Sequence, residues 1–287
     1  MSQINLKPYA QYLTDNSKSH NTIKSYLNHI ERFLKFSNNP TILTRQHLLS
    51  YKSSLQDDNS AQTICAKLSA IKSYNEYLID QGLMTETIVM SKDFPKIQKQ
   101  IISPAKVSEN EALKFLDKIY ENECFRNYTI AILMHHVGTR ITETLNIKLK
   151  DINFEDGICI MRSTTTKGNK ERKVYLNDTV IKVLEEYITK HRSTYTRAKT
   201  SPYLFCSRQS DKLTYNAIEA VFDKYSKKVN PHQLRHAMAT WAIKPKEQGG
   251  GGLSLQQLAG QLGHGSIQTT VMYTHPDGNT MRKMLNR

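Results

Sequence analysis

The sequence contains few cysteines and no long apolar segment. Its four cysteines lie far apart, and no two of them form a Cys-x-x-Cys pair. This scatter argues against a zinc ribbon and against a small scaffold held together by disulfides. No stretch approaches the ~18 consecutive apolar residues of a membrane span, and the N-terminus lacks the apolar run of a secretory signal. We therefore expect a cytoplasmic protein that has no membrane partner.

Signatures of nucleotide and metal chemistry are also absent. The sequence has neither a G-x-x-x-x-G-K-[ST] loop nor a G-x-G-x-x-G loop, so we expect no nucleotide hydrolysis. It has no carboxylate cluster of the kind that holds Mg²⁺ for hydrolysis by paired metal ions. His232 and His236 have a spacing that would let them share a metal, but no H-E-x-x-H motif accompanies them. We expect no metal and no cofactor.

The sequence does contain an excess of positive charge. Lysine and arginine together number 40 against 26 aspartates and glutamates, which gives a net charge of +14 and a pI near 9.5. A field of this sign attracts polyanions, and nucleic acid is the most common such partner. An anionic membrane surface is a weaker alternative, because no single basic amphipathic helix stands out. The charge alone predicts phosphate binding but specifies no reaction.

The first half of the chain has helical periodicity. Apolar residues recur at helical spacing over residues 21–36 and 61–80, and residues 44–56 are expected to form a shorter helix between them. Lys67 and Lys72 lie away from the apolar stripe of the 61–80 segment. Both are therefore candidates for contact with DNA phosphates, although each is equally consistent with solvated surface.

A basic segment separates the two halves of the chain. Residues 91–107 contain Pro95, Pro104 and four lysines without clear periodicity, which is typical of an extended linker. We therefore predict a helical domain over residues 1–90, a linker over residues 91–107 and a second domain over residues 108–287.

The second half combines helices with a small β-element, so we predict a mainly α fold with a small β-sheet. Ser108 and the glutamate three residues later form a capping-box pattern that marks a helix start. Residues 158–162 and 172–176 alternate as strands do, with a hairpin-like turn at residues 167–170. Residues 244–252 are expected to be a flexible loop. The helix that starts near Ser108 is expected to end near residue 120, and another helix is expected to start at residue 231. The remaining expected helices cover residues 126–137, 141–148, 177–192, 215–228, 253–262, 266–273 and 279–285.

Five short segments of this half carry side chains suited to phosphate chemistry. They are Gly138-Thr-Arg140-Ile-Thr-Glu143, Thr166-Lys167-Gly-Asn-Lys170-Glu-Arg172, Pro231-His232-Gln-Leu-Arg235-His236, Leu262-Gly-His264 and Val271-Met-Tyr273. Each segment alone would be unremarkable in many proteins. Their joint occurrence in this order, with a tyrosine nine residues after the last histidine, resembles the tyrosine recombinases, also called the phage integrase family. The resemblance covers roughly residues 108–287, and a weaker similarity to the family's helical core-binding domain covers residues 21–84.

The resemblance implies catalytic roles for Arg140, Lys167, His232, Arg235, His264 and Tyr273. Two guanidiniums can grip the oxygens of a phosphodiester with paired donors, and positive charge aimed at the transition state is usually the largest catalytic contribution. Tyr273 would be the nucleophile and Lys167 the general acid for the departing 5′ oxygen. Tyrosine has an ordinary pKa of about 10, and a nearby cationic cluster would favour its phenolate.

Other side chains near these six residues are expected to play smaller roles. His264 would donate a hydrogen bond to the same phosphate, and His232 would either accept the tyrosine proton or orient the phosphate. Glu143 and His236 are expected to support the site. Lys170 and Arg172, in and beside the expected β-turn, are candidates for DNA contact.

The resemblance further implies a site-specific recombinase that cleaves and rejoins double-stranded DNA through a 3′-phosphotyrosyl intermediate and a Holliday junction. Four protomers would assemble on two inverted-repeat core sites, with the C-terminal helix docking on a neighbour or folding back onto its own domain. The role would be resolution of dimers or transposon cointegrates, as in Xer-like enzymes and transposon resolvases, or integration and excision. A type IB topoisomerase-like enzyme and a catalytically silent DNA-binding module are the alternatives.

Overall fold

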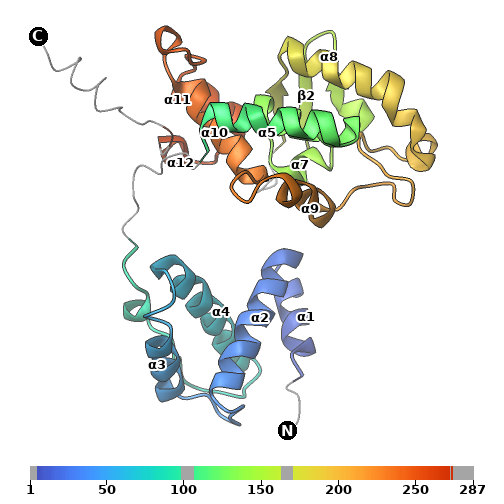
Figure 1. Ribbon diagram of the computed structural model, residues 1–287. Coiled ribbons are helices and arrows are strands. Elements are labelled where there is room, and N and C mark those ends of the chain that lie inside the picture. The colour runs from blue at the N-terminus through green and yellow to red at the C-terminus, as the bar shows by residue number, and fades with distance from the viewer. Residues whose placement is uncertain (1–4, 98–106, 163–170, 272, 274–287) are drawn as a thin grey trace, which may run out of the picture. The chain divides into compact units, whose positions relative to one another are not determined.

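The protein forms two compact units, Met1–Lys99 and Gln100–Arg287, each with its own apolar core. Their structure is a computed structural model that describes residues 5–97, 107–162, 171–271 and 273. The fold is mainly α-helical with one small sheet, which confirms the predicted fold class (Figure 1). None of the helices in these ranges is long and apolar enough to cross a membrane.

The described part of the first unit is built from four α-helices around one core. They are α1 (Lys7–Asp15), α2 (His20–Phe36), α3 (Arg45–Ser54) and α4 (Ala61–Asp80). The side chains of Ser19, Thr44 and Ser60 accept backbone N–H groups in the first turns of α2, α3 and α4, which explains where these helices begin. The sequence pattern did not predict α1, because its buried face consists of Tyr9 and Leu13 alone.

The first part of the predicted linker is packed against this unit instead of being extended. Ser91–Asp93 forms a short 3₁₀ helix, and the buried carboxylate of Asp93 is ion-paired with Arg45 of α3. Phe94 packs against the apolar core of the same unit. A buried carboxylate needs a partner of opposite charge, and Arg45 supplies it from a distant part of the sequence. Val107, at the other end of the predicted linker, is fully buried in the core of the second unit.

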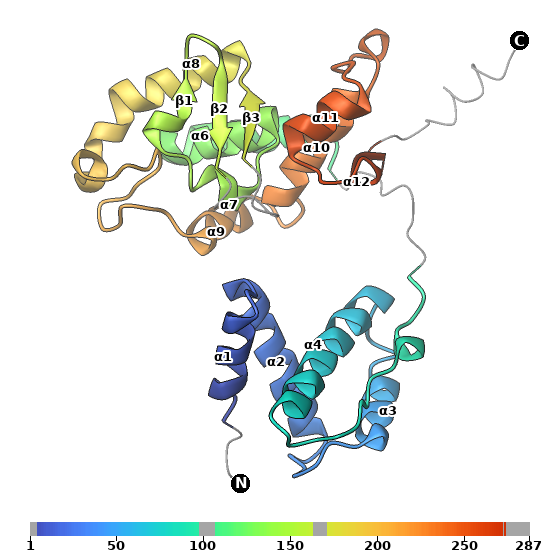
Figure 2. The ribbon, with the colours of Figure 1, turned by 180° about the vertical axis from the view of Figure 1, so that it is seen from behind.

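The second unit packs helices around a three-stranded antiparallel sheet of order β1-β2-β3 (Figure 2). Its strands are β1 (Ile152–Asn153), β2 (Ile158–Met161) and β3 (Arg172–Tyr175). Its α-helices are α5 (Glu109–Asn122), α6 (Phe125–Ile132), α7 (Ile141–Thr144), α8 (Asp178–Glu186), α9 (Tyr215–Tyr225), α10 (Pro231–Ile243), α11 (Leu255–Leu262) and α12 (Gln268–Val271). Cys159 of β2 pairs with Val174 of β3, and both side chains are buried in the core. Because β3 is the last strand in the order, it forms an edge of the sheet, and it lies beside α11.

Several short helical turns complete the second unit. They are the π-helical turns Leu133–Val137 (η2) and Tyr187–His191 (η5), and the 3₁₀ turns Leu149–Asp151 (η3), Arg192–Thr194 (η6), Thr196–Lys199 (η7) and Lys246–Gln248 (η8). The helix predicted over residues 141–148 ends early, at Thr144. Beyond it the backbone of Leu149 donates to the carbonyl of Pro202, and Lys148 pairs with Tyr203. These long-range bonds override the local helical pattern.

The segment predicted to be a flexible loop, residues 244–252, is an ordered turn between α10 and α11. Its backbone N–H groups bond back to the end of α10: Gly251 donates to the carbonyl of Trp241 at 2.9 Å, and Gly252 donates to that of Lys244 at 2.9 Å. Leu253 then donates to the carbonyl of Ala242 at 2.8 Å. The glycine run thus holds the start of α11 against the end of α10.

Candidate active site

The turn that carries Arg140 is fixed by a glycine. The π-helical turn η2 is followed by Gly138, which adopts a left-handed backbone with φ +71°. A Cβ atom at this position would lie 2.8 Å from the Leu262 side chain and 2.9 Å from the sulfur of Met238. Only glycine therefore lets the turn approach α10 and α11 this closely. Arg140 lies two residues further along the chain and is the N-cap residue of α7.

Glu143 lies at the centre of an arginine cluster. The residue is 1% exposed. Its Oε1 accepts from Arg140 at 2.8 Å, and Arg172 donates to Oε1 at 3.1 Å and to Oε2 at 2.8 Å. A guanidinium nitrogen of Arg235 lies 3.9 Å from Oε2. Burial raises the pKa of Glu143, but hydrogen bonds and positive charge from Arg172 and Arg140 outweigh burial and hold that pKa below its ordinary value.

Arg235 is buried between the Arg140 turn and the end of α11. Its guanidinium donates to the carbonyl of Gly138 at 2.5 Å and to the carbonyl of Leu262 at 2.7 Å. The same group lies 3.3 Å from Nε2 of His264. Burial, helped by the charge of Arg140, lowers the pKa of Arg235 to about 10. The side chain therefore stays charged at neutral pH.

His264 is held in one tautomer by its two neighbours. A guanidinium can only donate, so Nε2 of His264 accepts from Arg235 and carries no proton. The proton must then sit on Nδ1, which donates to Oγ1 of Thr270 at 2.8 Å. Burial, together with the charge of Arg235, lowers the pKa of His264 to about 4. At neutral pH this histidine is uncharged.

Tyr273 lies between two histidine rings. His264 stacks on it with ring centroids 6.0 Å apart, and His236 meets it edge-on at 5.1 Å. Nε2 of His236 is in turn 2.9 Å from Nε2 of His232. Tyr273 is 3% exposed and packs with Leu258 in a small apolar cluster between α10 and α11.

The protonation of this group differs from the expectation of a phenolate. Burial raises the pKa of Tyr273, and the charges of Arg235 and Arg140 only partly offset that effect. Burial also lowers the pKa of His232, and it lowers that of His236 to about 4. The site as it stands thus holds a neutral phenol beside neutral imidazoles.

The structure brings most of the residues singled out from the sequence into one place. Those assembled here are Arg140, Glu143, His232, Arg235, His236, His264 and Tyr273. Lys167 and Lys170 lie outside the described residues. Arg172 is placed differently from the expectation. Its guanidinium does not point toward a separate DNA contact but is held by Glu143, because that buried carboxylate needs a second cation.

Two residues of the site escaped the sequence pattern. Thr270 is fully buried and bonds to His264. Gln261 exchanges two hydrogen bonds of 3.0 Å with the backbone of Tyr175, at the edge of β3, and its amide nitrogen lies 3.3 Å from the carbonyl of Val137. A threonine and a glutamine have no distinctive spacing of their own. Their roles depend on contacts between distant segments.

Two of the lysines proposed for DNA contact, Lys67 and Lys72, lie in the first unit and differ from each other. Lys67 is 8% exposed and donates to Oδ1 of Asn59 at 2.8 Å, so it is not solvated surface. Burial and the charge of Arg32 lower its pKa. Lys72 is exposed and lies 3.8 Å from Glu76 on the same helix. An exposed pair of this kind contributes little to stability.

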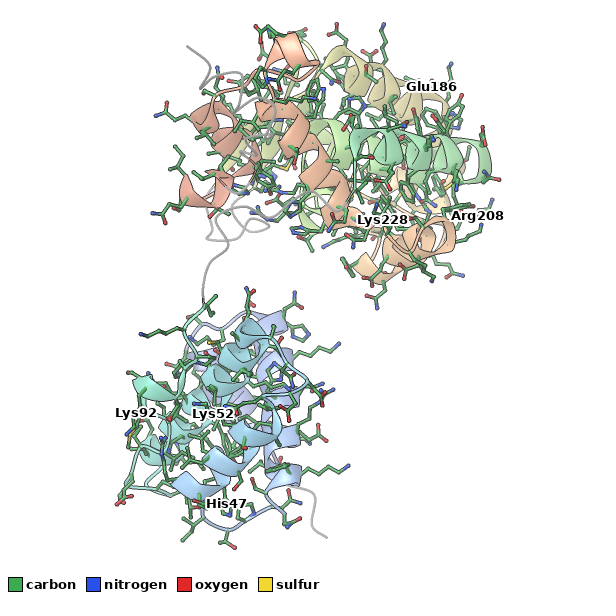
Figure 3. All side chains as sticks on the ribbon, turned by 60° about the vertical axis from the view of Figure 1, so that its left-hand side comes forward. His47, Lys52, Lys92, Glu186, Arg208 and Lys228 are labelled. Atoms are coloured by element: carbon green, nitrogen blue, oxygen red, sulfur yellow. The ribbon has the colours of Figure 1, made fainter. Side chains whose placement is uncertain are left out.

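The described residues contain no group of three or more His, Cys, Asp or Glu side chains placed to hold a metal ion. Basic side chains do project from the surfaces of both units, among them Lys92 of the first and Arg208 of the second (Figure 3). Positive charge is therefore available outside the arginine cluster as well.

Comparison with protein families assigns both units. The phage integrase family matches residues 106–280, and the phage integrase N-terminal SAM-like domain matches residues 6–84. The chain belongs to the phage integrase family. The TnP I resolvase of Bacillus thuringiensis is 36% identical to this integrase-family chain over 278 residues, covering 94% of the chain and 95% of the relative. Tyrosine recombinase XerA of Pyrococcus horikoshii is 29% identical over 290 residues, and the match covers 98% of this chain and 92% of that relative.

Solved structures of integrase-family proteins agree with this assignment. The crystal structure of XerA recombinase matches with a TM-score of 0.53 and 26% identity, covering 97% of this chain and 96% of that one. A lambda integrase dimer bound to a core site shares the fold, with a TM-score of 0.71, 16% identity and 95% coverage of both chains. The chain is a tyrosine site-specific recombinase, as predicted, and none of these findings favours the topoisomerase-like or binding-only alternatives.

Proposed function

We propose that this recombinase cleaves and rejoins double-stranded DNA at inverted-repeat core sites through a covalent bond to Tyr273. The observation that carries the proposal is a chain of contacts: Tyr273 stacks on His264, His264 bonds to Arg235, and Arg235 lies with Arg140 beside the buried carboxylate of Glu143. Positive charge and hydrogen-bond donors are gathered beside a tyrosine. A phosphodiester is the substrate that needs both, because it is anionic before attack and gains charge on its oxygens during attack.

Arg140 and Arg235 would hold the scissile phosphate. The guanidinium of Arg140 bonds to Glu143 through a single nitrogen, Nη1, and the Arg140 side chain is 31% exposed. Its remaining N–H groups can donate to phosphate oxygens in a planar, paired geometry. Arg235 is fixed by two backbone carbonyls. Little reorganisation is then required when the substrate arrives.

A bound phosphate would also change the state of His264. In the present structure Arg235 donates to its Nε2. A phosphate oxygen placed between the two side chains would accept from Arg235 and attract a proton to Nε2 of His264. The negative charge of the phosphate raises the histidine pKa. His264 would then become a second donor to the same phosphate.

The proposed chemical step uses these side chains. The Tyr273 oxygen attacks phosphorus, the bond from phosphorus to the 5′ oxygen breaks, and the DNA 3′ end stays on the enzyme as a phosphotyrosine. His232 is neutral, in contact with His236, and serves as acceptor for the tyrosine proton. We assign the proton for the departing 5′ oxygen to Lys167 by family resemblance. A 5′-hydroxyl of another strand reverses the step, so no nucleotide is consumed.

For the biological role we propose resolution of joined DNA molecules, such as transposon cointegrates. The support is the 36% identity to a protein named TnP I resolvase, which extends over almost the full length of both chains. Resolution requires two sites in one molecule, so four protomers would assemble, one on each half-site. The enzyme would act in the cytoplasm, where such DNA lies. The C-terminal helix expected over residues 279–285 lies outside the described residues, and its docking in trans remains part of this proposal.

The test is covalent capture on a nicked suicide substrate. The substrate is a duplex from the DNA beside the gene that contains short inverted repeats separated by several base pairs. We expect the wild-type protein to become attached to a 3′ phosphate and Tyr273→Phe to bind the same DNA without attachment. Denaturing gels report attachment, and mass spectrometry identifies the modified tyrosine.

Other outcomes of this experiment would contradict the proposal. DNA binding without attachment by the wild-type protein would indicate a binding module. Relaxation of a supercoiled plasmid that lacks the site would indicate a topoisomerase-like enzyme. Attachment that persists in Tyr273→Phe would place the nucleophile elsewhere.

A further inference from the structure

Glu143 has more positive charge around it than one carboxylate can neutralise. Three guanidiniums, those of Arg140, Arg172 and Arg235, lie within 3.9 Å of its oxygens. The buried cluster therefore carries a net charge of two positive. Arg172 contacts both oxygens in a bidentate pair, whereas Arg140 uses one guanidinium nitrogen and Arg235 stays at 3.9 Å. A bidentate pair is the strongest arrangement of an arginine and a carboxylate.

The place occupied by Arg172 is shaped for a guanidinium. At Gly263, which has φ +68°, an added Cβ would lie 2.6 Å from Cζ of Arg172. The Nε of Arg172 also lies 3.4 Å from the carbonyl of Gln261. The edge strand β3, the end of α11 and Glu143 thus enclose this side chain, of which 12% is exposed. A phosphate contact would not require such an enclosure.

We propose that Arg172 is a positioning residue that neutralises Glu143, so that Glu143 can orient Arg140 without cancelling the positive charge that Arg140 and Arg235 present to a phosphate. The inference rests on the proposed function of this site. Without Arg172 the same carboxylate would draw its counter-charge from Arg140 and Arg235. The cluster would then offer one net positive charge instead of two.

The influences on the pKa of Glu143 agree with a role of Arg172 in neutralising this carboxylate. Burial is the largest influence and raises the pKa of Glu143. The hydrogen bond from Arg172 is the largest influence that lowers it, ahead of the contributions of Arg140. Arg172 is therefore the main reason that this buried carboxylate remains ionised.

The test is a double-substitution cycle on the cleavage step. Single-turnover attachment to the nicked substrate is measured at saturating DNA for wild type, Arg172→Met, Glu143→Gln and the double variant. We expect Arg172→Met to slow attachment by about tenfold to a hundredfold, in the range for loss of transition-state stabilisation. Glu143→Gln should slow it as well, because Arg140 loses a charged anchor. The double variant has the same net charge as wild type and should react at least about fivefold faster than Arg172→Met.

Rescue by the second substitution separates a charge-based role from a structural one. If Arg172 only supports the fold, the two losses multiply and the double variant is slower than either single variant, which would overturn the inference. If wild type itself forms no attachment, the proposed function fails instead. Lys173→Met removes an exposed cation from the same strand and should leave the rate at saturating DNA unchanged.

A second variant keeps the test decisive if Arg172→Met does not fold. Arg172→Lys retains the charge but cannot form a bidentate pair. If both variants fold, the attachment rate of Arg172→Lys should lie between those of wild type and Arg172→Met. If only Arg172→Lys folds, its attachment rate should be about threefold to tenfold below that of wild type. A folded Arg172→Lys that reacts more than about tenfold more slowly than wild type would show that a positive charge at this position does not preserve the rate, and would contradict the inference.

Discussion

His264 shows how a neighbouring side chain decides what an imidazole can donate. The guanidinium of Arg235 donates to Nε2 of His264, and Oγ1 of Thr270 accepts from Nδ1–H of His264. The hydrogen bond to Thr270 therefore keeps the Nδ1–H tautomer and holds the ring parallel to Tyr273. This orientation is the one from which Nε2 can face a phosphate that lies against Arg235.

Thr270→Val should impair cleavage while the protein still binds DNA. Valine has nearly the shape of threonine but no acceptor, so the buried Nδ1–H of His264 is left without its partner, at a cost of about 1–3 kcal/mol. We expect single-turnover attachment to slow by about fivefold to 150-fold, which is that free energy expressed as a change in rate. Thr269→Val is the matched control, because Thr269 is exposed. A wild-type rate in Thr270→Val would show that this hydrogen bond does not position His264.

Single residues of the site differ in how well the sequence predicts them. His232 and Arg235 belong to one short motif on one helix, so their proximity follows from local spacing. The placement of Arg172 does not follow in this way. It depends on a carboxylate in α7 and on a glycine after α11, which only the tertiary structure brings together. Strand alternation predicts that Arg172 lies on a strand but not which partner it meets.

At the scale of elements, the glycine run between α10 and α11 allows a tight turn in which side chains would clash with the backbone. A Cβ atom at Gly250 would lie 2.1 Å from the carbonyl oxygen of Lys244, and one at Gly251 would lie 3.0 Å from the backbone of Ala242. The neighbouring Gly249 has φ +75°, which disfavours other residues. Composition alone suggests flexibility here, whereas the structure shows close backbone contact.

Gly250→Ala should therefore destabilise the second unit, by about 2 kcal/mol or more, because the backbone must move to remove the overlap. This corresponds to a lowering of the melting temperature by about 4 °C or more. Gly260→Ala is the matched control. Gly260 lies within α11 with nothing within 4 Å of an added Cβ, so alanine should stabilise that helix by about 0.5–1 kcal/mol. Equal effects of the two substitutions would mean that the turn is flexible after all.

Helices with long apolar stripes were predicted well, and short elements were not. The helix predicted over residues 61–80 matches α4 at both ends, because its cap and its stripe agree. The helix predicted over residues 141–148 was too long: α7 ends at Thr144, and the backbone of Leu149 already bonds with the distant Pro202. Local periodicity determines an element only where no distant segment competes for its backbone hydrogen bonds.

At the scale of the whole molecule, the stability of the second unit depends on partly buried histidines, two of which, His236 and His264, belong to the candidate active site. Burial is the main cause that lowers the pKa values of His136, His236 and His264 to about 4. In an unfolded chain histidine titrates near 6.5. The unfolded state therefore binds more protons than the folded state between these values. Stability is complete above about pH 6.5 and is lost as the pH falls toward 4.

Carboxylates contribute little in the upper part of this pH range. The ion pair with Lys228, together with hydrogen bonds from Ser108, lowers the pKa of Glu111 to about 2. The stability that such a depressed carboxylate supplies is present above its ordinary pKa and is lost only as the pH falls below about 4.5. Between about pH 6.5 and 4.5 the buried histidines should therefore dominate the pH dependence of unfolding.

We expect the melting temperature of the second unit to be lower at pH 5 than at pH 7, and His136→Gln to reduce that difference. His136 lies outside the arginine cluster, and its Nδ1 is 3.2 Å from the amide nitrogen of Asn177. Glutamine removes the titrating ring while keeping a polar side chain there. Calorimetry of the full chain at both pH values and constant ionic strength measures the effect, with His20→Gln at an exposed position as the control. A pH difference in His136→Gln as large as that of wild type would show that this half-buried imidazole is not a source of the acid sensitivity.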